Sequence, residues 1–589
     1  MHNMKRNICL VVIGAASCLM SLNAGQNMQK IRSLDSNLID AMDALYVTQG
    51  MSLPSQTAPY SDAELALMLS KINKNSLTKG QKVLYKHIED ALDLNPLVSL
   101  PAVALEVSGE ATAEAYAQTN PTDYDLQGDW KEGTPAPFAD ATAGLWLFRN
   151  LYIGVAYPFG LNTNFADGSV WGDQQYSTNI PGIGQQGTVG DISIMGPNRA
   201  FISLGGNYWN LQIGRDRLKW GAGTTGNLVL GDNLPYQTFA KATAFGSNYK
   251  YTFLTAFYPY PEDYMDDGDT NPTTGLEAED ASDGLYMFMG HRLEWRMFHD
   301  KLGFALNETI MFQDANGNID PRYISPAAIF HDYYIRANAN SLLGFEMDTT
   351  LLKNLNFYGQ VVVDEFVLPG EDEAGEDGYL PPALGYLAGA TYYKVKDDGV
   401  ILKANVEFAY TDPLLYLRYG TSQSDFDYGI SYVVAFRESA SNRSAVYENT
   451  FLGYPYGGDA IVGNLNLSAR KLGKWETDIN FMYMLHGVFD QYTKWAGGAG
   501  DDIANLSTPT TSWSGSFADD DYETIGVTDP EDRNAVINMF DLGFSGSRYF
   551  LKFMKVFAQT DVVYTINKGN ISGSNALDMQ LTVGCSVGL

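Results

Sequence analysis

Cysteine is nearly absent from this 589-residue chain, which has three in all. Cys9 and Cys18 lie inside an apolar N-terminal stretch with the features of a secretory signal, so Cys585 alone would remain after its removal. An intramolecular disulfide is thereby excluded. An exported chain of this size must instead be held together by burial or by closed backbone pairing.

Long apolar runs and positive charge are also scarce. Beyond the N-terminal stretch there is no run of about 18 apolar residues, which excludes transmembrane helices. Lys and Arg number 38 against 69 Asp and Glu, and losing Lys5 and Arg6 with the signal leaves 36 against 69, a net charge of −33. Nucleic acid is therefore not an expected partner. An anionic polymer would also be repelled unless a local cationic site or a bridging metal intervened.

Residues 1–24 are predicted to be the signal peptide. Lys5 and Arg6 give it a basic start, an apolar stretch comes next, and Ala24 is a small residue suited to cleavage. A lipoprotein signal with Cys18 acylated is the alternative, although the usual aliphatic residue three positions earlier is missing. Either signal would send the chain across the inner membrane.

Residues 25–96 carry a helical pattern. Apolar side chains recur at helical spacing in three segments, and Ser61 with Glu64 three residues later forms a predicted capping box. A unit of about 70 residues is small for a core that is stable by itself. We therefore expect it to pack against the chain beyond residue 96. A helical bundle that folds independently is the alternative.

From residue 100 to the end, at 589, the apolar period changes to two. In the first strand the apolar face is formed by Val103, Leu105, Val107, Gly109, Ala111 and Ala113, and the face between them carries carboxylates. The last strand alternates in the same way, with one face formed by Leu577, Met579, Leu581, Val583, Cys585, Val587 and Leu589. Residues 355–364 and 400–410 repeat the pattern.

Such strands, separated by Gly, Asn and Asp turns, are typical of a transmembrane β-barrel with a polar interior. For a structure built from strands, only closure into a barrel gives every backbone N–H and C=O group a hydrogen-bond partner in hydrocarbon. The length suits roughly 16–18 antiparallel strands, so the predicted fold is mainly β: an outer-membrane barrel preceded by a small periplasmic helical unit. A soluble sandwich or propeller shares the alternation but does not explain the signal or the interfacial aromatics, predicted to be Tyr249, Tyr251, Phe257, Tyr258, Tyr260, Tyr392 and Tyr393.

Four acidic segments rich in Gly and Asn are expected to be long loops: 158–198, 259–283, 368–382 and 495–532. Their runs of Asp and Glu are predicted to be solvated tips, with divalent cations as the alternative. A further stretch from Asp314 to Asp320 has the alternating oxygen ligands of a calcium loop, but its Asn-Gly pair first indicates a hairpin turn.

The stretch 208–239 departs from this repetition. It begins as a half-buried strand, and then Arg215, Arg217 and Lys219 place three cations on what had been the apolar face. Either the strand leaves its apolar surroundings here or a bulge near Gly214 shifts the phase. Three glycines come next and allow sharp turns before a second apolar segment that ends in Asp232 and Asn233.

This segment resembles the Wzi family of capsule-assembly proteins. The matching positions are Asp216, Arg217, Trp220, Gly221, Gly223, Leu228, Leu230 and Asn233. A second stretch, 321–326, is similar to an Arg-x-x-Ser-Pro element of the family, and the order of a helical part before a large barrel agrees as well. The resemblance implies an outer-membrane lectin that helps attach capsular or related polysaccharide to the cell surface.

The predicted ligand site combines the types of side chain that hold saccharides, namely an aromatic face, amides, carboxylates and cations. A buried Arg–Asp lattice that braces the barrel lumen would use the same residues and is the alternative. The residues of the predicted site are Arg215, Asp216, Arg217, Lys219, Trp220, Asn227, Asp232 and Asn233.

No catalytic signature accompanies this site. The sequence has neither His-Glu-x-x-His nor Gly-x-Ser-x-Gly, so no enzyme activity, resident metal or cofactor is predicted. The expected partners are surface polysaccharide and outer-membrane lipid, with a periplasmic partner for the helical unit left open. A diffusion porin for small solutes is the alternative function.

Overall fold

The computed structural model describes the helical unit and most of the barrel wall. The described residues are 27–93, 96–119, 136–161, 176–180, 192–193, 197–260, 284–314, 316–319, 323, 330, 339–365, 383–417, 430–439, 445–491, 493, 506–511, 532–551 and 553–588. The predicted signal, Cys18, the acidic runs and most of the four expected long loops lie outside them. No helix of the described part has the length and apolarity needed to cross a membrane.

Three α-helices come first, and strands come after them. The helices are α2 (Asn37–Gln49), α3 (Asp62–Ser70) and α4 (Lys79–Leu92). Eighteen strands form the barrel wall: β3 (Val103–Gln118), β4 (Ala139–Leu147), β5 (Leu151–Leu161), β8 (Arg199–Gly205), β9 (Trp209–Asp216), β11 (Gln237–Phe245), β12 (Tyr249–Tyr258), β13 (Leu285–Met297), β14 (Leu302–Asp314), β15 (Ala339–Leu352), β16 (Leu355–Glu365), β17 (Ala383–Val395), β18 (Ile401–Thr411), β21 (Ala460–Lys471), β22 (Trp475–His486), β23 (Ile537–Leu551), β24 (Met554–Ile566) and β25 (Asn575–Gly588).

Seven short strands add to this wall or lie apart from it. These are β1 (Thr57–Ala58), β2 (Val98–Ser99), β6 (Tyr176–Thr178), β7 (Ile192–Ser193), β10 (Lys219–Trp220), β19 (Val433–Ser439) and β20 (Ala445–Phe451).

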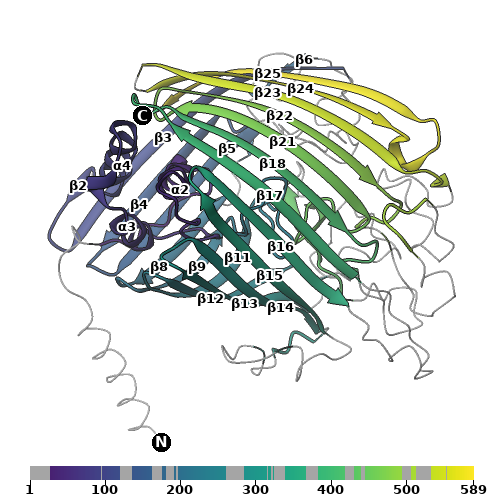
Figure 1. Cartoon of the computed structure of the whole chain (residues 1–589), viewed down its shortest axis with the longest axis horizontal. Coiled ribbons are helices and arrows are strands. Elements are labelled where there is room, and N and C mark those ends of the chain that lie inside the picture. The colour runs from purple at the N-terminus through teal and green to yellow at the C-terminus, as the bar shows by residue number, and fades with distance from the viewer. Residues whose placement is uncertain are drawn as a thin grey trace, which may run out of the picture.

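The wall is a closed antiparallel barrel (Figure 1). Each strand pairs with the next in the order given, and β25 pairs back onto β3 from Gly588↔Glu110 to Gln580↔Gln118. Closure leaves the wall without an unpaired edge, which is the condition for crossing hydrocarbon with strands. The predicted fold class is confirmed.

The predicted faces of the strands are confirmed as well. On β25, Leu577 is 57% exposed on the outer surface, whereas Gln580, which faces the lumen, is 3% exposed. Tyr249, Phe257 and Tyr392 are exposed, as expected of interfacial aromatics. Tyr258 and Tyr260 pack with the apolar core in the lumen, so their assignment to the interface was wrong. Tyr393 faces inward and packs in the core of the helical unit, so its assignment to an aromatic belt was wrong.

The helical unit lies at one end of the barrel (Figure 1). Short turns join the strands at this end, which faces the periplasm in barrels of this type. The predicted capping box of Ser61 and Glu64 is present at the start of α3. The core of this unit is shared with the barrel, because Tyr393 and Ile401 of the wall complete it. The alternative of an independent bundle was therefore wrong.

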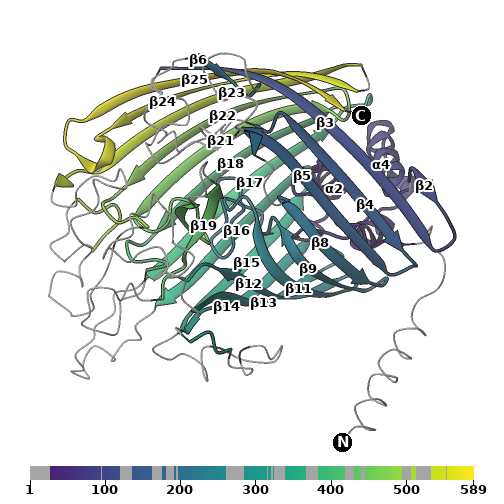
Figure 2. The ribbon, with the colours of Figure 1, turned by 180° about the vertical axis from the view of Figure 1, so that it is seen from behind.

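An apolar core occupies the part of the lumen lined by β11–β18 and β21–β24. Two segments of the chain leave the wall to form it. One is the stretch between β9 and β11, with Leu218, Trp220 and Leu228, and the other connects β18 to β21 and includes the β19–β20 hairpin. β19 is seen within the ring of strands in Figure 2.

The connection between β14 and β15 covers part of the outer wall. Tyr323 packs on outward-facing Phe312 with ring centroids 4.9 Å apart, and Phe330 packs on His291 at 5.0 Å. Earlier in this connection, Asp314 Oδ1 accepts hydrogen bonds from the N–H groups of Asn316 and Asn318 at 3.0 Å. The Asn-Gly pair thus forms a local turn at the start of a long connection, and the predicted hairpin was wrong.

The two faces of the wall predict opposite responses to charge. Val406 is at the centre of β18 and points outward, whereas Ser108 of β3 points into the lumen. Val406→Arg is expected to destabilise the folded barrel by about 2–4 kcal/mol, because the guanidinium would enter hydrocarbon. Ser108→Arg is the matched control and is expected to have little effect. Urea unfolding in lipid vesicles measures both, and equal effects of the two variants would contradict the assigned faces.

Candidate functional site

The predicted site begins where the chain leaves the barrel wall. Arg215, the second-last residue of β9, is exposed on the same outer face as Ile213. Gly214 has a φ of 139°, a backbone conformation that favours glycine. After Asp216 the chain turns into the lumen, where Lys219 and Trp220 form β10. The three cations therefore do not form one row, because Arg215 stays on the wall while Arg217 and Lys219 belong to the inserted segment.

Asp216 is buried and paired with a residue that the sequence pattern did not indicate. Arg199 of β8 donates two hydrogen bonds to its carboxylate, at 2.6 and 2.9 Å, and Gln212 donates a third at 3.2 Å. The backbone N–H of Arg217 also donates to Asp216 Oδ1, at 2.9 Å. This carboxylate fixes the point at which the chain leaves the wall and has no free oxygen to offer a ligand.

Arg217, Lys219 and Asp232 come together as predicted. Lys219 Nζ lies 3.1 Å from Asp232 Oδ2, and Arg217 donates to the Asp232 carbonyl at 3.1 Å. Burial alone would raise the pKa of Asp232, but the two cations outweigh it and hold that pKa below its usual value. The second partner of Arg217 is Asp35 at 2.7 Å, whose side chain is 71% exposed. These are the partly accessible charges of the predicted site.

Trp220, by contrast, is fully buried. Its ring lies edge-on to Phe288 with ring centroids 6.2 Å apart. The guanidinium carbon of Arg292 lies 5.9 Å from the centroid of the Trp220 ring. Gly290 makes room for the ring, because a side chain there would meet it at 2.9 Å. No face of Trp220 is left for a sugar to stack on, so its role in this structure is packing.

The inserted segment is anchored to the wall through its backbone. Glu407 accepts the N–H groups of Thr224 and Thr225, both at 2.8 Å. Gln360 donates to Asn227 Oδ1 at 2.7 Å and accepts the N–H of Leu228 at 2.9 Å. Asn227 is thus part of the anchor and fully buried.

A second set of contacts joins the two segments that enter the lumen. Tyr416 donates its hydroxyl to the Leu228 carbonyl at 2.5 Å. Asn233 donates to Thr450 Oγ1 at 3.0 Å and to the Phe451 carbonyl at 2.7 Å. The two segments therefore pack as one body, and Asn233 holds them together.

The N-terminal unit reaches the inserted segment from the end of the barrel at which the helices lie. β1 pairs with β10, Thr57 opposite Trp220, and the N–H of Gly221 donates to the Gln56 carbonyl at 2.7 Å. Thr57 also accepts a hydrogen bond from Arg292 at 2.6 Å. Arg292 in turn is held by Glu294 and Glu346, with Arg292 Nη2 3.0 Å from Glu346 Oε2. A fully buried guanidinium between two carboxylates thus anchors the junction.

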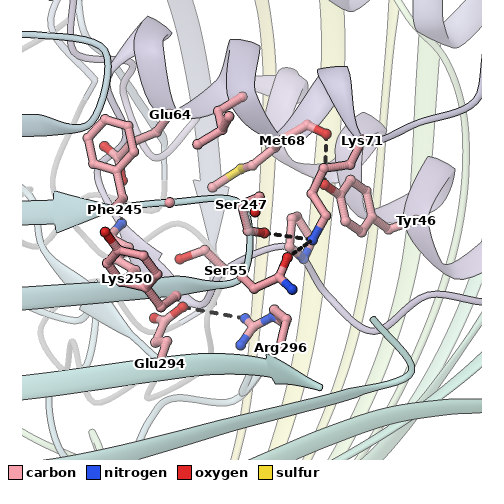
Figure 3. Close-up of a pocket in the computed structure, with 15 residues that line it drawn as sticks. Tyr46, Ser55, Glu64, Met68, Lys71, Phe245, Ser247, Lys250, Glu294 and Arg296 are labelled. Atoms are coloured by element: carbon pink, nitrogen blue, oxygen red, sulfur yellow. Dashed lines mark hydrogen bonds and ion pairs between the residues drawn. The ribbon is translucent and has the colours of Figure 1, made fainter. Parts of the chain in front are cut away.

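Figure 3 shows a small cavity at the seam between the helices and the wall. An ion pair and a hydrogen bond join the two parts: Lys250 lies 2.6 Å from Glu64, and Lys71 donates to the Ser247 carbonyl at 2.6 Å. The cavity volume is about 30 Å³, enough for a water but far below the roughly 300–1,000 Å³ of ligand pockets. This cavity belongs to the joint and is not a saccharide site.

A larger hollow of about 780 Å³ lies along the wall at β22–β25 and β3. The side chains that line it mostly point outward, toward the membrane, and include Ala113, Ala115, Val556, Ala558, Val583 and Cys585. A groove on this apolar face suits lipid rather than a polar ligand.

The eight predicted residues thus divide into three groups. Arg217, Lys219 and Asp232 form a partly accessible charge cluster, Arg215 lies apart on the outer wall, and the structural anchors are Asp216, Trp220, Asn227 and Asn233. The sequence analysis missed the partners on other strands, Arg199 on the neighbouring β8 and Gln360 and Glu407 on the distant β16 and β18. Their only signal was a polar residue on the inward face of an alternating strand.

Comparison with known proteins supports the fold. No family model and no curated protein matches this chain. Among solved structures, Wzi of Escherichia coli, an outer-membrane protein involved in group 1 capsule assembly and described as a carbohydrate-binding β-barrel, matches with a TM-score of 0.50 and 14% identity, over 94% of this chain and 98% of that chain. The fold is therefore Wzi-like, and it is the fold of a bacterial outer-membrane protein.

Channel proteins of the outer membrane are more distant matches. DcaP of Acinetobacter baumannii matches with 8% identity and a TM-score of 0.34, over 84% of this chain and 100% of that chain. OccD3 of Pseudomonas aeruginosa matches with 10% identity and a TM-score of 0.36, over 82% and 91%.

The burial of Trp220 leads to a prediction that separates packing from binding. Trp220→Ala is expected to cost about 3–5 kcal/mol, because it opens a cavity between the inserted segment and the wall. The melting temperature of the purified barrel measures this effect. Trp209→Ala is the control, since Trp209 is 44% exposed on the outer surface. A Trp220→Ala barrel that melts like the native protein would contradict a packing role.

Proposed function

We propose that this chain is a polysaccharide-binding protein of the bacterial outer membrane that helps attach or assemble capsular or related surface polysaccharide. It binds the polymer without cleaving it. The observation that carries the proposal is the Wzi-like fold over nearly the whole chain, because Wzi itself is described as a carbohydrate-binding barrel. The matching residues of the stretch 208–239 lie at the centre of that fold.

The contents of the lumen favour this function over a diffusion porin. A solute pore needs a continuous wet path, whereas large apolar side chains fill the part of the lumen beside β11–β18. The inserted segments are anchored by buried hydrogen bonds, such as those of Glu407 and Gln360. Displacing them would leave buried donors without acceptors, which is costly.

Arg217 and Lys219 are the proposed contacts for the polymer. The chain carries a large excess of acidic residues, so an acidic polysaccharide needs a local cationic site. The side chains of Arg217 and Lys219 are 26% and 27% exposed, and the Asp35 partner of Arg217 is largely in solvent. Exposed pairs of this kind contribute only about 0–1 kcal/mol, so a carboxylate of the polymer can replace Asp35.

The proposal is tested with the double variant Arg217→Gln/Lys219→Gln. Charge-assisted contacts contribute about 1.5–3 kcal/mol each, so losing two is expected to weaken polysaccharide binding at least about tenfold. Because the native partners of these cations are partly exposed, melting is expected to change little. Polysaccharide retention on cells and melting of the purified barrel are measured on the same variant.

Arg215→Gln is the matched control, since Arg215 is a neighbouring cation that faces outward. It is expected to retain polysaccharide like the native protein. If the double variant melted lower and retained polysaccharide in proportion to the surviving protein, the two cations would be a brace and not a contact. Equal loss in the control would also refute the proposed site.

A further inference from the structure

The inward face of β22–β24 carries two carboxylates with no counter-charge. Asp541 of β23 is 1% exposed and Asp561 of β24 is 4% exposed. Neither oxygen of Asp541 has a hydrogen-bond partner, and Oδ1 of Asp561 has none. Gln559 donates to the other Asp561 oxygen at 3.3 Å. No Lys, Arg or His of the described residues forms an ion pair with either carboxylate.

The strand register brings these two groups together around a glycine. Gly543 is two residues from Asp541 on the same inward face of β23. Asp561 lies directly opposite Gly543 on one side, and Asn480 of β22 lies opposite it on the other. Asp541 is therefore diagonal to both Asp561 and Asn480, and diagonal neighbours on one face of a sheet are about 7–8 Å apart. Gly543 contributes no side chain, so its neighbours can converge over it.

The flanking side chain of Asn480 supplies a further oxygen ligand. Asn480 is 4% exposed, and its amide nitrogen has no hydrogen-bond partner. Because the two ends of an amide can be exchanged by rotation, its oxygen can equally face the carboxylates. The set then comprises two carboxylates and one amide, and water can add further oxygen ligands.

We propose that Asp541, Asp561 and Asn480 form a binding site for a divalent cation of the calcium type on the lumen wall. Two adjacent buried carboxylates without counter-charge are unfavourable, and a dication neutralises both. Calcium takes 6–8 oxygen ligands in flexible geometry, from carboxylates, amide carbonyls and water. The three side chains offer up to five such oxygens, and water can supply the rest.

The ligand types agree with a hard cation. The set contains no sulfur or imidazole ligand of the kind that zinc or copper prefers. It holds only two charged ligands, so neutral oxygens must complete the coordination.

The site does not depend on the proposed polysaccharide function. It lies on β22–β24, whereas Arg217 and Lys219 belong to the segment between β9 and β11. A cation here would join three adjacent strands through their side chains. The barrel would then be more stable with calcium than without it, since a ligand that binds only the folded state stabilises that state.

The test is a calorimetric titration of the folded, full-length barrel in detergent with CaCl2, after removal of bound metal with EDTA. One saturable site is expected. Asp541→Asn and Asp561→Asn are each expected to weaken calcium binding at least about tenfold, because each removes a ligand charge. Calcium should also raise the melting temperature of the native barrel and leave that of the two variants unchanged.

Asp578→Asn is the matched control. Asp578 also faces the lumen, on β25, but it lies 3.8 Å from Lys568 and so already has a counter-charge. It should bind calcium like the native barrel. Asn480→Ala is a milder second variant, with a smaller loss of affinity, should an Asp variant fail to fold.

Three outcomes would overturn the proposal. The first is a native barrel without saturable calcium binding. The second is calcium binding that persists unchanged in both Asp variants, which would assign the ion to acidic residues elsewhere. The third is a native barrel whose melting temperature does not change when calcium is added, together with an Asp541→Asn variant that melts at a higher temperature than the native barrel. This result would indicate a shared proton in place of a metal.

Discussion

Backbone pairing between β25 and β3 is the constraint on which the rest of this structure depends. The last strand hydrogen-bonds to the first from Gly588↔Glu110 onward, and the ring has no free edge. Inside a membrane this pairing is required, because unpaired N–H and C=O groups would face hydrocarbon. An eighteen-strand ring is wide, however, and closure alone leaves a lumen that must hold either water or protein.

This chain places protein in much of that lumen. The stretch after β9 meets the N-terminal segment at the β1–β10 pairing, and the buried Arg292 holds the junction between Glu294 and Glu346. The helical unit, the inserted segments and the wall thus form one continuous body. Opening a path through this part of the lumen would break buried hydrogen bonds, which is costly.

The sequence was most informative about the wall. The two-residue period assigns Leu577 outward and Asp578 inward, because one face meets lipid and the other the lumen. The capping box of Ser61 was equally readable, since it is local. The path of the stretch 217–236 could not be predicted from the sequence. The sequence left open whether the strand leaves its apolar surroundings or a bulge shifts its phase, and in the structure Leu218 and Trp220 pack inside the lumen.

The partners that decide this outcome are far apart in the sequence. Glu407 binds Thr224 across 183 positions, which no local pattern can reveal. We infer that the inserted segments close the lumen to free diffusion, and planar-bilayer conductance of the purified, full-length barrel tests this most directly. The account predicts no large, stable open-channel steps. Large steps of reproducible size would contradict it and favour a porin.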